Sequence, residues 1–325
     1  MQEMMKKRAL QLLQDGTVER VLAWKTGEFS YDITPAVFES AEEIEKDFVY
    51  DAFCAANLSK YLVALSKKEG KALAFLKPCD SYSFQQLMKE HRVDRDNVYI
   101  IGIACDGKAD ADKIKDSGIK GIKNIADNGD KLVVETIYSE STELDKKDFL
   151  AERCLNCKSR KVVIYDEMIG ENGEVLDSNR FDMVEKIEAM TSEERFEFWQ
   201  NELSRCIRCN ACRNVCPACT CEKCVFDNDA SGIANKAAAN SFEENMFHII
   251  RAFHVAGRCT DCGECSRVCP QHIPLHLLNR KFIKDMNEFY GEYQAGEDLE
   301  TRPPLVNFTM DDVEPSIVNE KGGKE

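Results

Sequence analysis

The sequence predicts an α/β domain with a parallel sheet, followed by a smaller, mainly α-helical domain. In the first half, buried strand-like runs alternate with amphipathic helical stretches, which is the pattern of a sheet covered by helices. In the second half, helix-like segments flank a cysteine-rich sequence motif that occurs twice, and we call each copy a word. The 325 residues, 43% of them hydrophobic, suffice for about two domains. We expect the α/β domain at residues 1–180, the helical domain at 181–295 and an extended acidic arm at 296–325.

The order of elements in the first half defines the expected sheet. The sequence indicates a helix at 3–15, an apolar strand-like run at 18–24, a buried strand at 72–78, a helix at 81–90 and a second buried strand at 97–105. A strand, a helix and a strand in succession form a βαβ unit. The two buried strands should therefore be parallel neighbours.

Charge and cysteine content restrict the classes of function. With 43 basic and 58 acidic residues the net charge is −15, which argues against binding nucleic acid through its phosphates. Residues 1–16 lack the uninterrupted apolar core of a signal peptide, and no run of about 18 apolar residues occurs, so we expect a cytoplasmic protein without a membrane span. Sixteen cysteines in a reducing compartment are expected to bind metal or to react rather than to form disulfides.

Two copies of one cysteine word carry the clearest chemistry. The first word is CIRCNACRNVCP at 206–217 and the second is CTDCGECSRVCP at 259–270. Both read C-x2-C-x2-C-x3-C-P, the run that holds 4Fe-4S clusters in two-cluster ferredoxins, where the fourth cysteine binds the other cluster. The expected ligand sets are Cys206, Cys209, Cys212 and Cys269 for one cluster and Cys259, Cys262, Cys265 and Cys216 for the other. A zinc ribbon is the alternative, although zinc sites do not require the third and fourth cysteines of this word.

Two further cysteines follow the predicted parallel strands. Cys79 and Cys105 come just after the carboxyl ends of these strands, which meet at one edge of an open sheet. The pair Cys154 and Cys157 could complete a third set of four thiolates for a 4Fe-4S cluster. The alternative is that Cys79 and Cys105 are small core residues.

Four cysteines remain after these three sets. They are Cys54, Cys219, Cys221 and Cys224, and the last three lie within six positions. A fourth 4Fe-4S cluster or a zinc site joining the domains is one interpretation; packing beside the clusters, with Cys54 in a core, is the other. Five arginines interleave with the ligands and either raise the cluster potentials or form ordinary surface pairs: Arg205, Arg208, Arg213, Arg258 and Arg267.

The segments LKPCDSYSFQQL, IGIACDG and RCLNCKSRKVVIYDEMIGE resemble the beta subunit of deazaflavin-reducing hydrogenases and formate dehydrogenases over residues 50–170. This resemblance implies a 4Fe-4S cluster on Cys79, Cys105, Cys154 and Cys157 beside a flavin, FAD or FMN. The sequence has no G-x-G-x-x-G after a strand, so flavin binding stays open. The second half resembles dicluster iron–sulfur subunits that accompany heterodisulfide-reductase-like, hydrogenase and formate or aldehyde oxidoreductase modules in anaerobes.

These observations predict an electron-transfer subunit rather than a catalytic one. It would relay single electrons between partner subunits of an anaerobic oxidoreductase complex, such as a flavoprotein or a hydrogenase, formate dehydrogenase or aldehyde dehydrogenase module. One alternative is a flavin-containing subunit that exchanges electrons with a soluble two-electron carrier. A second alternative is a zinc-stapled scaffold.

Overall fold

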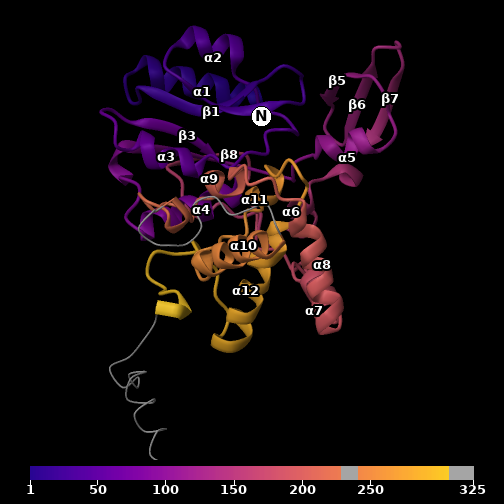
Figure 1. The fold of residues 1–325 in the computed structure, drawn as a ribbon. Coiled ribbons are helices and arrows are strands. Elements are labelled where there is room, and N and C mark those ends of the chain that lie inside the picture. The colour runs from indigo at the N-terminus through magenta and orange to yellow at the C-terminus, as the bar shows by residue number, and fades with distance from the viewer. Residues whose placement is uncertain (228–240, 307–325) are drawn as a thin grey trace, which may run out of the picture.

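The computed structural model describes residues 1–227 and 241–306. It contains an α/β part, a small three-stranded sheet that projects to one side, and a helical part below (Figure 1). The predicted fold class is confirmed, since the large sheet is mostly parallel and the second half is helical.

The large sheet has five strands in the order β2-β1-β3-β4-β8. The strands are β1 Arg20–Thr26, β2 Ile33–Phe38, β3 Ala72–Leu76, β4 Val98–Ile103 and β8 Glu167–Ile169. β3 and β4 pair in parallel with Ala74 opposite Ile100, as the sequence predicts for a βαβ unit. β3 is buried along its whole length, which explains its uninterrupted apolar sequence. The hairpin of β1 with β2 supplies the one antiparallel pairing in this sheet.

Helices cover both faces of the large sheet. α1 Gln2–Gln14 and α2 Ala41–Asp47 lie on one face, whereas α3 Ser59–Leu65 and α4 Pro78–Lys89 lie on the other (Figure 1). The α4 helix begins at Pro78, three residues earlier than the sequence pattern suggests, because proline fits the first turn of a helix. Cys79 therefore stands in the first turn of α4, directly above the end of β3.

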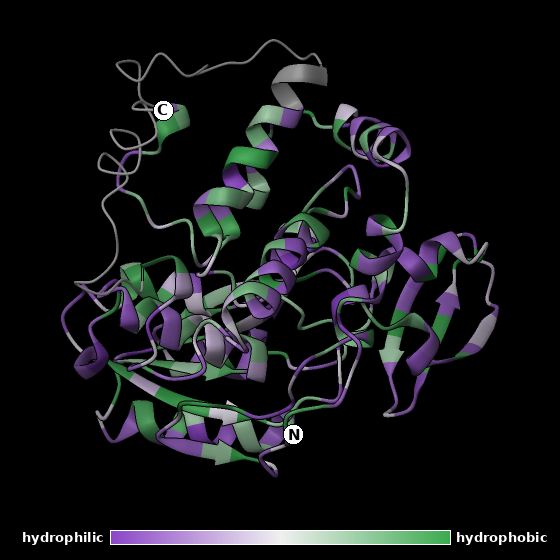
Figure 2. Cartoon of the chain, turned by 90° about the horizontal axis from the view of Figure 1, so that it is seen from below, coloured by the Kyte–Doolittle hydropathy of each residue, from purple (hydrophilic) through white to green (hydrophobic). Residues whose placement is uncertain are grey.

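The small sheet consists of β5 Ile122–Asp127, β6 Lys131–Thr136 and β7 Ser141–Asp145, all antiparallel. This sheet is not among the elements predicted from the sequence. Hydrophobic and hydrophilic residues are interspersed along its strands (Figure 2), and Leu132 and Val134 form part of a separate small core. Two short helices flank it in sequence, α5 Ala111–Asp116 and α6 Glu152–Leu155.

The helical part surrounds the two cysteine words. Its helices are α7 Asp182–Glu188, α8 Ser192–Ser204, α9 Ala211–Val215, α10 Ser241–Val255, α11 Glu264–Arg267 and α12 Leu275–Tyr290. Thr191 and Glu194 form the capping box that begins α8. The short helices α9 and α11 lie inside the first and second word, and they contact each other.

The helical part packs against the α3 and α4 side of the large sheet. Arg258 forms an ion pair with Glu90 of α4, and Ser83 shares a hydrogen bond of 2.8 Å with Thr260 of the second word. The chain then returns past α4, where Gly296 lies against the Tyr82 carbonyl. The rest of the expected acidic arm, from residue 307 onward, lies outside the described residues. Within the described ranges, no helix is long and apolar enough to cross a membrane.

Candidate metal centres

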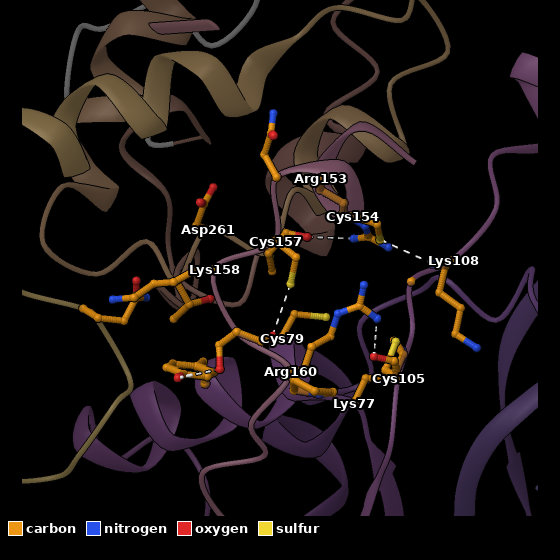
Figure 3. A pocket seen from close by; sticks show the side chains of 18 of the residues that line it. Lys77, Cys79, Cys105, Lys108, Arg153, Cys154, Cys157, Lys158, Arg160 and Asp261 are labelled. Carbon is orange, nitrogen blue, oxygen red and sulfur yellow. Dashed lines mark hydrogen bonds between the residues drawn. The ribbon is translucent and has the colours of Figure 1, made fainter. Parts of the chain in front are cut away.

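The four cysteines at the sheet edge line one cavity. Cys79 begins α4, Cys105 follows β4, Cys154 lies in α6 and Cys157 follows it (Figure 3). We call this space the strand-end cavity. The parallel register of β3 and β4 brings the first two cysteines to one edge, and α6 brings the CxxC pair over them.

The strand-end cavity fits a thiolate-bound group. The backbone amide of Lys108 donates to Cys154 Sγ over 3.4 Å, and the cationic side chains of Lys77, Arg153 and Arg160 line the space. Burial, together with the charge of Asp80, raises the pKa of Cys79 well above its ordinary value, and burial also raises the pKa of Cys157. The metal-free thiols of Cys79 and Cys157 are thus protonated at neutral pH. A metal that binds them would release protons.

The first word folds around a second cavity. It is lined by Cys206, Cys209, Cys212 and Cys269, and we call it the first-word cavity. These four residues are the set expected from the crossed ligand pattern. The Arg208 amide donates to Cys206 Sγ over 3.4 Å, an N–H···S bond of the kind that tunes clusters.

The second word repeats the backbone conformation of the first. Arg208 and Asn210 have φ of 54° and 62°, and Asp261 and Gly263 at the equivalent positions have φ of 59° and 67°. Left-handed residues are uncommon outside glycine, so their recurrence at matched positions marks a specific loop that turns its amides inward.

The remaining ligand of the second set comes from the first word. The charge of Cys216 raises the pKa values of Cys259, Cys262 and Cys265, after the larger effect of burial. Burial raises the pKa of Cys265 to about 11. We call Cys216, Cys259, Cys262 and Cys265 the second-word set. The charge interactions place Cys216 near the three cysteines of the second word, and the crossed ligand set stays a prediction.

The last four cysteines are not gathered in one place. Cys54 is fully buried in the core of the α/β part, where its Sγ lies 3.6 Å from the Val49 carbonyl oxygen and 3.6 Å from an Asp51 carboxylate oxygen. Cys219 instead forms a hydrogen bond with the thiol of Cys216, beside the second-word set.

Cys221 is exposed, and Cys224 forms a hydrogen bond with Arg213. Among the residues that the structure describes, no group of three or more His, Cys, Asp or Glu side chains is arranged to hold a single metal ion.

Two buried residues of α10, which the sequence pattern did not assign to a metal site, also lie near these cysteines. His248 is 1% exposed and its Nε2 lies 3.3 Å from Cys206 Sγ; burial and the charges of Arg251 and Arg208 lower its pKa to about 3, so it is neutral. Arg251 is 2% exposed and lies one helical turn further on. Their spacing of three on an amphipathic helix was the available signal, but no cysteine lies near them in sequence.

Comparison with known families places a domain over both words. Residues 202–273 match the family model of the 4Fe-4S dicluster domain. The chain carries a 4Fe-4S dicluster domain. This dicluster domain begins at the end of α8 and includes α9, α10, α11 and both words. It therefore contains the first-word cavity and the second-word set.

Two curated relatives resemble the chain along nearly its whole length. It is 26% identical over 357 positions to the F420-dependent formate dehydrogenase subunit beta of Methanocaldococcus jannaschii, covering 91% of this chain and 92% of the relative. It is also 26% identical over 355 positions to the F420-dependent formate dehydrogenase 1 subunit beta of Methanococcus maripaludis, covering 90% of each. The expected resemblance to formate dehydrogenase beta subunits is confirmed, and it extends beyond residues 50–170.

A solved structure was also matched. A chain of the F420-reducing NiFe hydrogenase complex from Methanosarcina barkeri shares 11% sequence identity with a TM-score of 0.39, covering 62% of this chain and 86% of that one.

Proposed function

We propose that the chain is an iron–sulfur electron-transfer subunit that relays single electrons within an oxidoreductase complex. One observation carries this proposal: Cys262 of the second-word set also lines the strand-end cavity. The dicluster domain and the likeness to formate dehydrogenase beta subunits support the same function. Bound 4Fe-4S clusters would supply one-electron redox chemistry, and the chain's own residues set their spacing and surroundings.

The three cysteine sets form a continuous series. The strand-end cavity adjoins the second-word set through Cys262, and the second-word set adjoins the first-word cavity through the contact of α11 with α9. The series reaches solvent at the first word, where Cys209 is exposed and Ile207 is 61% exposed. We infer that electrons pass between the strand-end cavity and a partner docked near Ile207.

Arg153 joins the first two members of this series. It stands between Cys154 and the dicluster domain, is nearly buried, and donates to the Cys262 carbonyl oxygen over 2.7 Å and to the Glu264 carboxylate over 2.5 Å. A fixed cation here excludes water and offsets the negative charge of nearby thiolates. The same contacts hold the two domains at a fixed separation.

Iron content tests this proposal. Anaerobically reconstituted protein is expected to hold about 12 irons per chain, four for each set of four cysteines. The variant Cys79→Ala should lose about four, whereas the matched control Cys54→Ala should lose none, because Cys54 lies in the core. Fewer than about eight irons in the unmodified chain, or zinc in place of iron, would refute the relay and favour the zinc-stapled scaffold.

The four remaining cysteines are tested by the same measurement. A fourth cluster built on Cys54, Cys219, Cys221 and Cys224 would raise the content to about 16 irons. In that case Cys54→Ala and Cys221→Ala would each remove about four. We infer instead that Cys219 packs beside the second-word set, since its thiol bonds to Cys216.

A groove favours flavin binding as a second candidate function. It has a volume of about 920 Å³, within the range of ligand sites, and lies between the β1–β2 connection and α5 on one side and α8 and the second word on the other. The aromatic rings of Phe29 and Tyr31 stack at its wall, and Arg153 lines both the groove and the strand-end cavity. FAD or FMN here would let the chain exchange electrons with a soluble two-electron carrier. Release of flavin on denaturation would support this candidate, and its absence with clusters intact would reject it.

Partners of the relay are proposed from the relatives. Because the relatives are named as formate dehydrogenase beta subunits, we propose that this chain binds a catalytic subunit of a formate dehydrogenase, an aldehyde dehydrogenase or a hydrogenase, or a flavoprotein. Anaerobic co-purification from the source, followed by identification of the bound chains, tests this. Recovery of the chain alone at low ionic strength would contradict it.

A further inference from the structure

Arg251 is a buried cation without a hydrogen-bonding partner. Its side chain projects from α10 and is 2% exposed. None of the three guanidinium nitrogens, Nε, Nη1 and Nη2, has a hydrogen-bond acceptor among the described residues. A buried charge that is neither paired nor hydrogen-bonded is strongly unfavourable, so its presence calls for an anion that belongs beside it.

The arginines inside and beside the cysteine words differ from Arg251 in this respect. Four of the five singled out by the sequence form ion pairs with carboxylates: Arg205 with Glu202, Arg213 with Asp227, Arg258 with Glu90 and Arg267 with Glu264. Their charges are already offset by the protein. They therefore contribute less to the potential of a cluster than an unpaired cation would.

The neighbours of Arg251 are cysteines from both expected ligand sets. Burial on its own would lower the pKa of Arg251, but the thiolates of Cys265, Cys212 and Cys216 raise it above the ordinary value, with a further contribution from Cys219. Cys212 lines the first-word cavity, whereas Cys216 and Cys265 belong to the second-word set. The guanidinium thus interacts electrostatically with cysteines of both sets.

We propose that Arg251 is the shared internal counter-cation of the two clusters of the dicluster domain and raises both of their reduction potentials. This inference rests on the proposed function, because it requires both clusters. Each one-electron reduction adds a negative charge to a cluster, and a fixed cation in a water-poor interior stabilises that charge without reorganisation. One residue then raises the reduction potentials of two successive clusters, which keeps the two potentials close together.

The effect of Arg251 on the stability of the fold changes sign when iron is absent. In the iron-free chain the anionic clusters that would face Arg251 are missing, and none of its guanidinium nitrogens has a hydrogen-bond acceptor among the described residues. Arg251 is then an uncompensated buried charge and destabilises the fold. The same side chain stabilises the cluster-loaded domain, where it faces anionic clusters. If Arg251 only packed against its neighbours, it would stabilise the iron-free chain and the cluster-loaded chain alike.

The experiment compares Arg251→Met, which removes the charge at similar length, with Arg251→Lys, which retains it. Reduction potentials are measured by EPR-monitored redox titration of the anaerobically reconstituted full chain. For Arg251→Met we expect the equilibrium constant for reduction of both dicluster clusters to fall at least about tenfold, a shift of about 59 mV for one electron. The strand-end cluster serves as the internal reference and should not shift. The control is Arg195→Met on α8, whose guanidinium donates to the Met190 carbonyl oxygen.

A second readout is the thermal stability of the iron-free chain. We expect iron-free Arg251→Met to melt at a higher temperature than iron-free unmodified protein. If Arg251→Met retains no clusters while Arg251→Lys retains both, the need for a cation is supported.

Other outcomes would overturn the inference. These are unchanged potentials in Arg251→Met, a shift of one dicluster cluster alone, equal loss of iron in both variants, or a lower melting temperature of the iron-free Arg251→Met chain. Unmodified protein that holds fewer than about eight irons would instead refute the proposed function before any variant is compared.

Discussion

Glu264 carries the buried ion-pair network at the boundary between the two domains. It is 0% exposed, and its carboxylate accepts hydrogen bonds from Arg153 over 2.5 Å and from Arg267 over 2.8 Å. Burial would raise the pKa of this carboxyl, yet the charges of Arg153 and Arg267 lower it from its ordinary value of 4.5 to about 2. At pH 7, above both values, a depression of this size corresponds to about 3 kcal/mol of stability.

The variant Glu264→Gln should therefore destabilise the protein by about 3–5 kcal/mol, because it leaves the buried guanidinium of Arg153 without its counter-ion. The assay is anaerobic urea denaturation of the cluster-loaded chain, followed by fluorescence. Since Arg153 belongs to the α/β domain and Glu264 to the dicluster domain, limited proteolysis between residues 157 and 206 should also become faster.

The matched control is Glu202→Gln, which removes the partner of the half-exposed Arg205. An exposed pair contributes about 0–1 kcal/mol, so this variant should behave nearly as the unmodified chain does. Equal losses of stability in the two variants would refute the reasoning, since burial of the pair would then be of no consequence.

Three further predictions concern the framework around the sites. Phe75→Ala on β3 should cost about 3–5 kcal/mol in urea denaturation, because Phe75 is fully buried, whereas Phe289→Ala should change stability by less than about 0.5 kcal/mol, since Phe289 is 75% exposed. Gly296→Ala should release the C-terminal segment and speed its proteolysis, because a Cβ there would lie 1.9 Å from the Tyr82 carbonyl oxygen and φ is +74°; unchanged cleavage would contradict this. Thr191→Ala should lower stability by about 1 kcal/mol through loss of the α8 capping box, and an unaltered denaturation midpoint would show that the cap is dispensable.

Local patterns predicted much of the framework. The apolar runs at 72–78 and 97–105 became the parallel strands β3 and β4, since residues buried on both faces leave an uninterrupted hydrophobic signal. The cysteine words predicted the lining of the first-word cavity, including the distant Cys269, because the crossed pattern is a property of the word.

Other features depend on tertiary contacts that a single sequence does not reveal. The small sheet β5–β7 has short, half-exposed strands whose alternation is weak against the surrounding charged residues. Arg251 interacts from α10 with cysteines of both words, and nothing in its local sequence distinguishes it from the arginines that form surface pairs. Cys54 could be placed in the core only once its neighbours Val49 and Asp51 were known.

The crossed arrangement of the two words has a consequence for biosynthesis. In the proposed ligand sets the first cluster uses Cys269, which lines the first-word cavity, and the second joins Cys216 to three cysteines synthesised later. A nascent chain that ends before residue 269 can offer three thiols to a first cluster but not the fourth. Iron delivery is therefore expected to follow translation of the whole dicluster domain. On the proposed ligand sets, a protein truncated between the words would hold no complete cluster site in that domain, so neither site can be completed before the second word is synthesised.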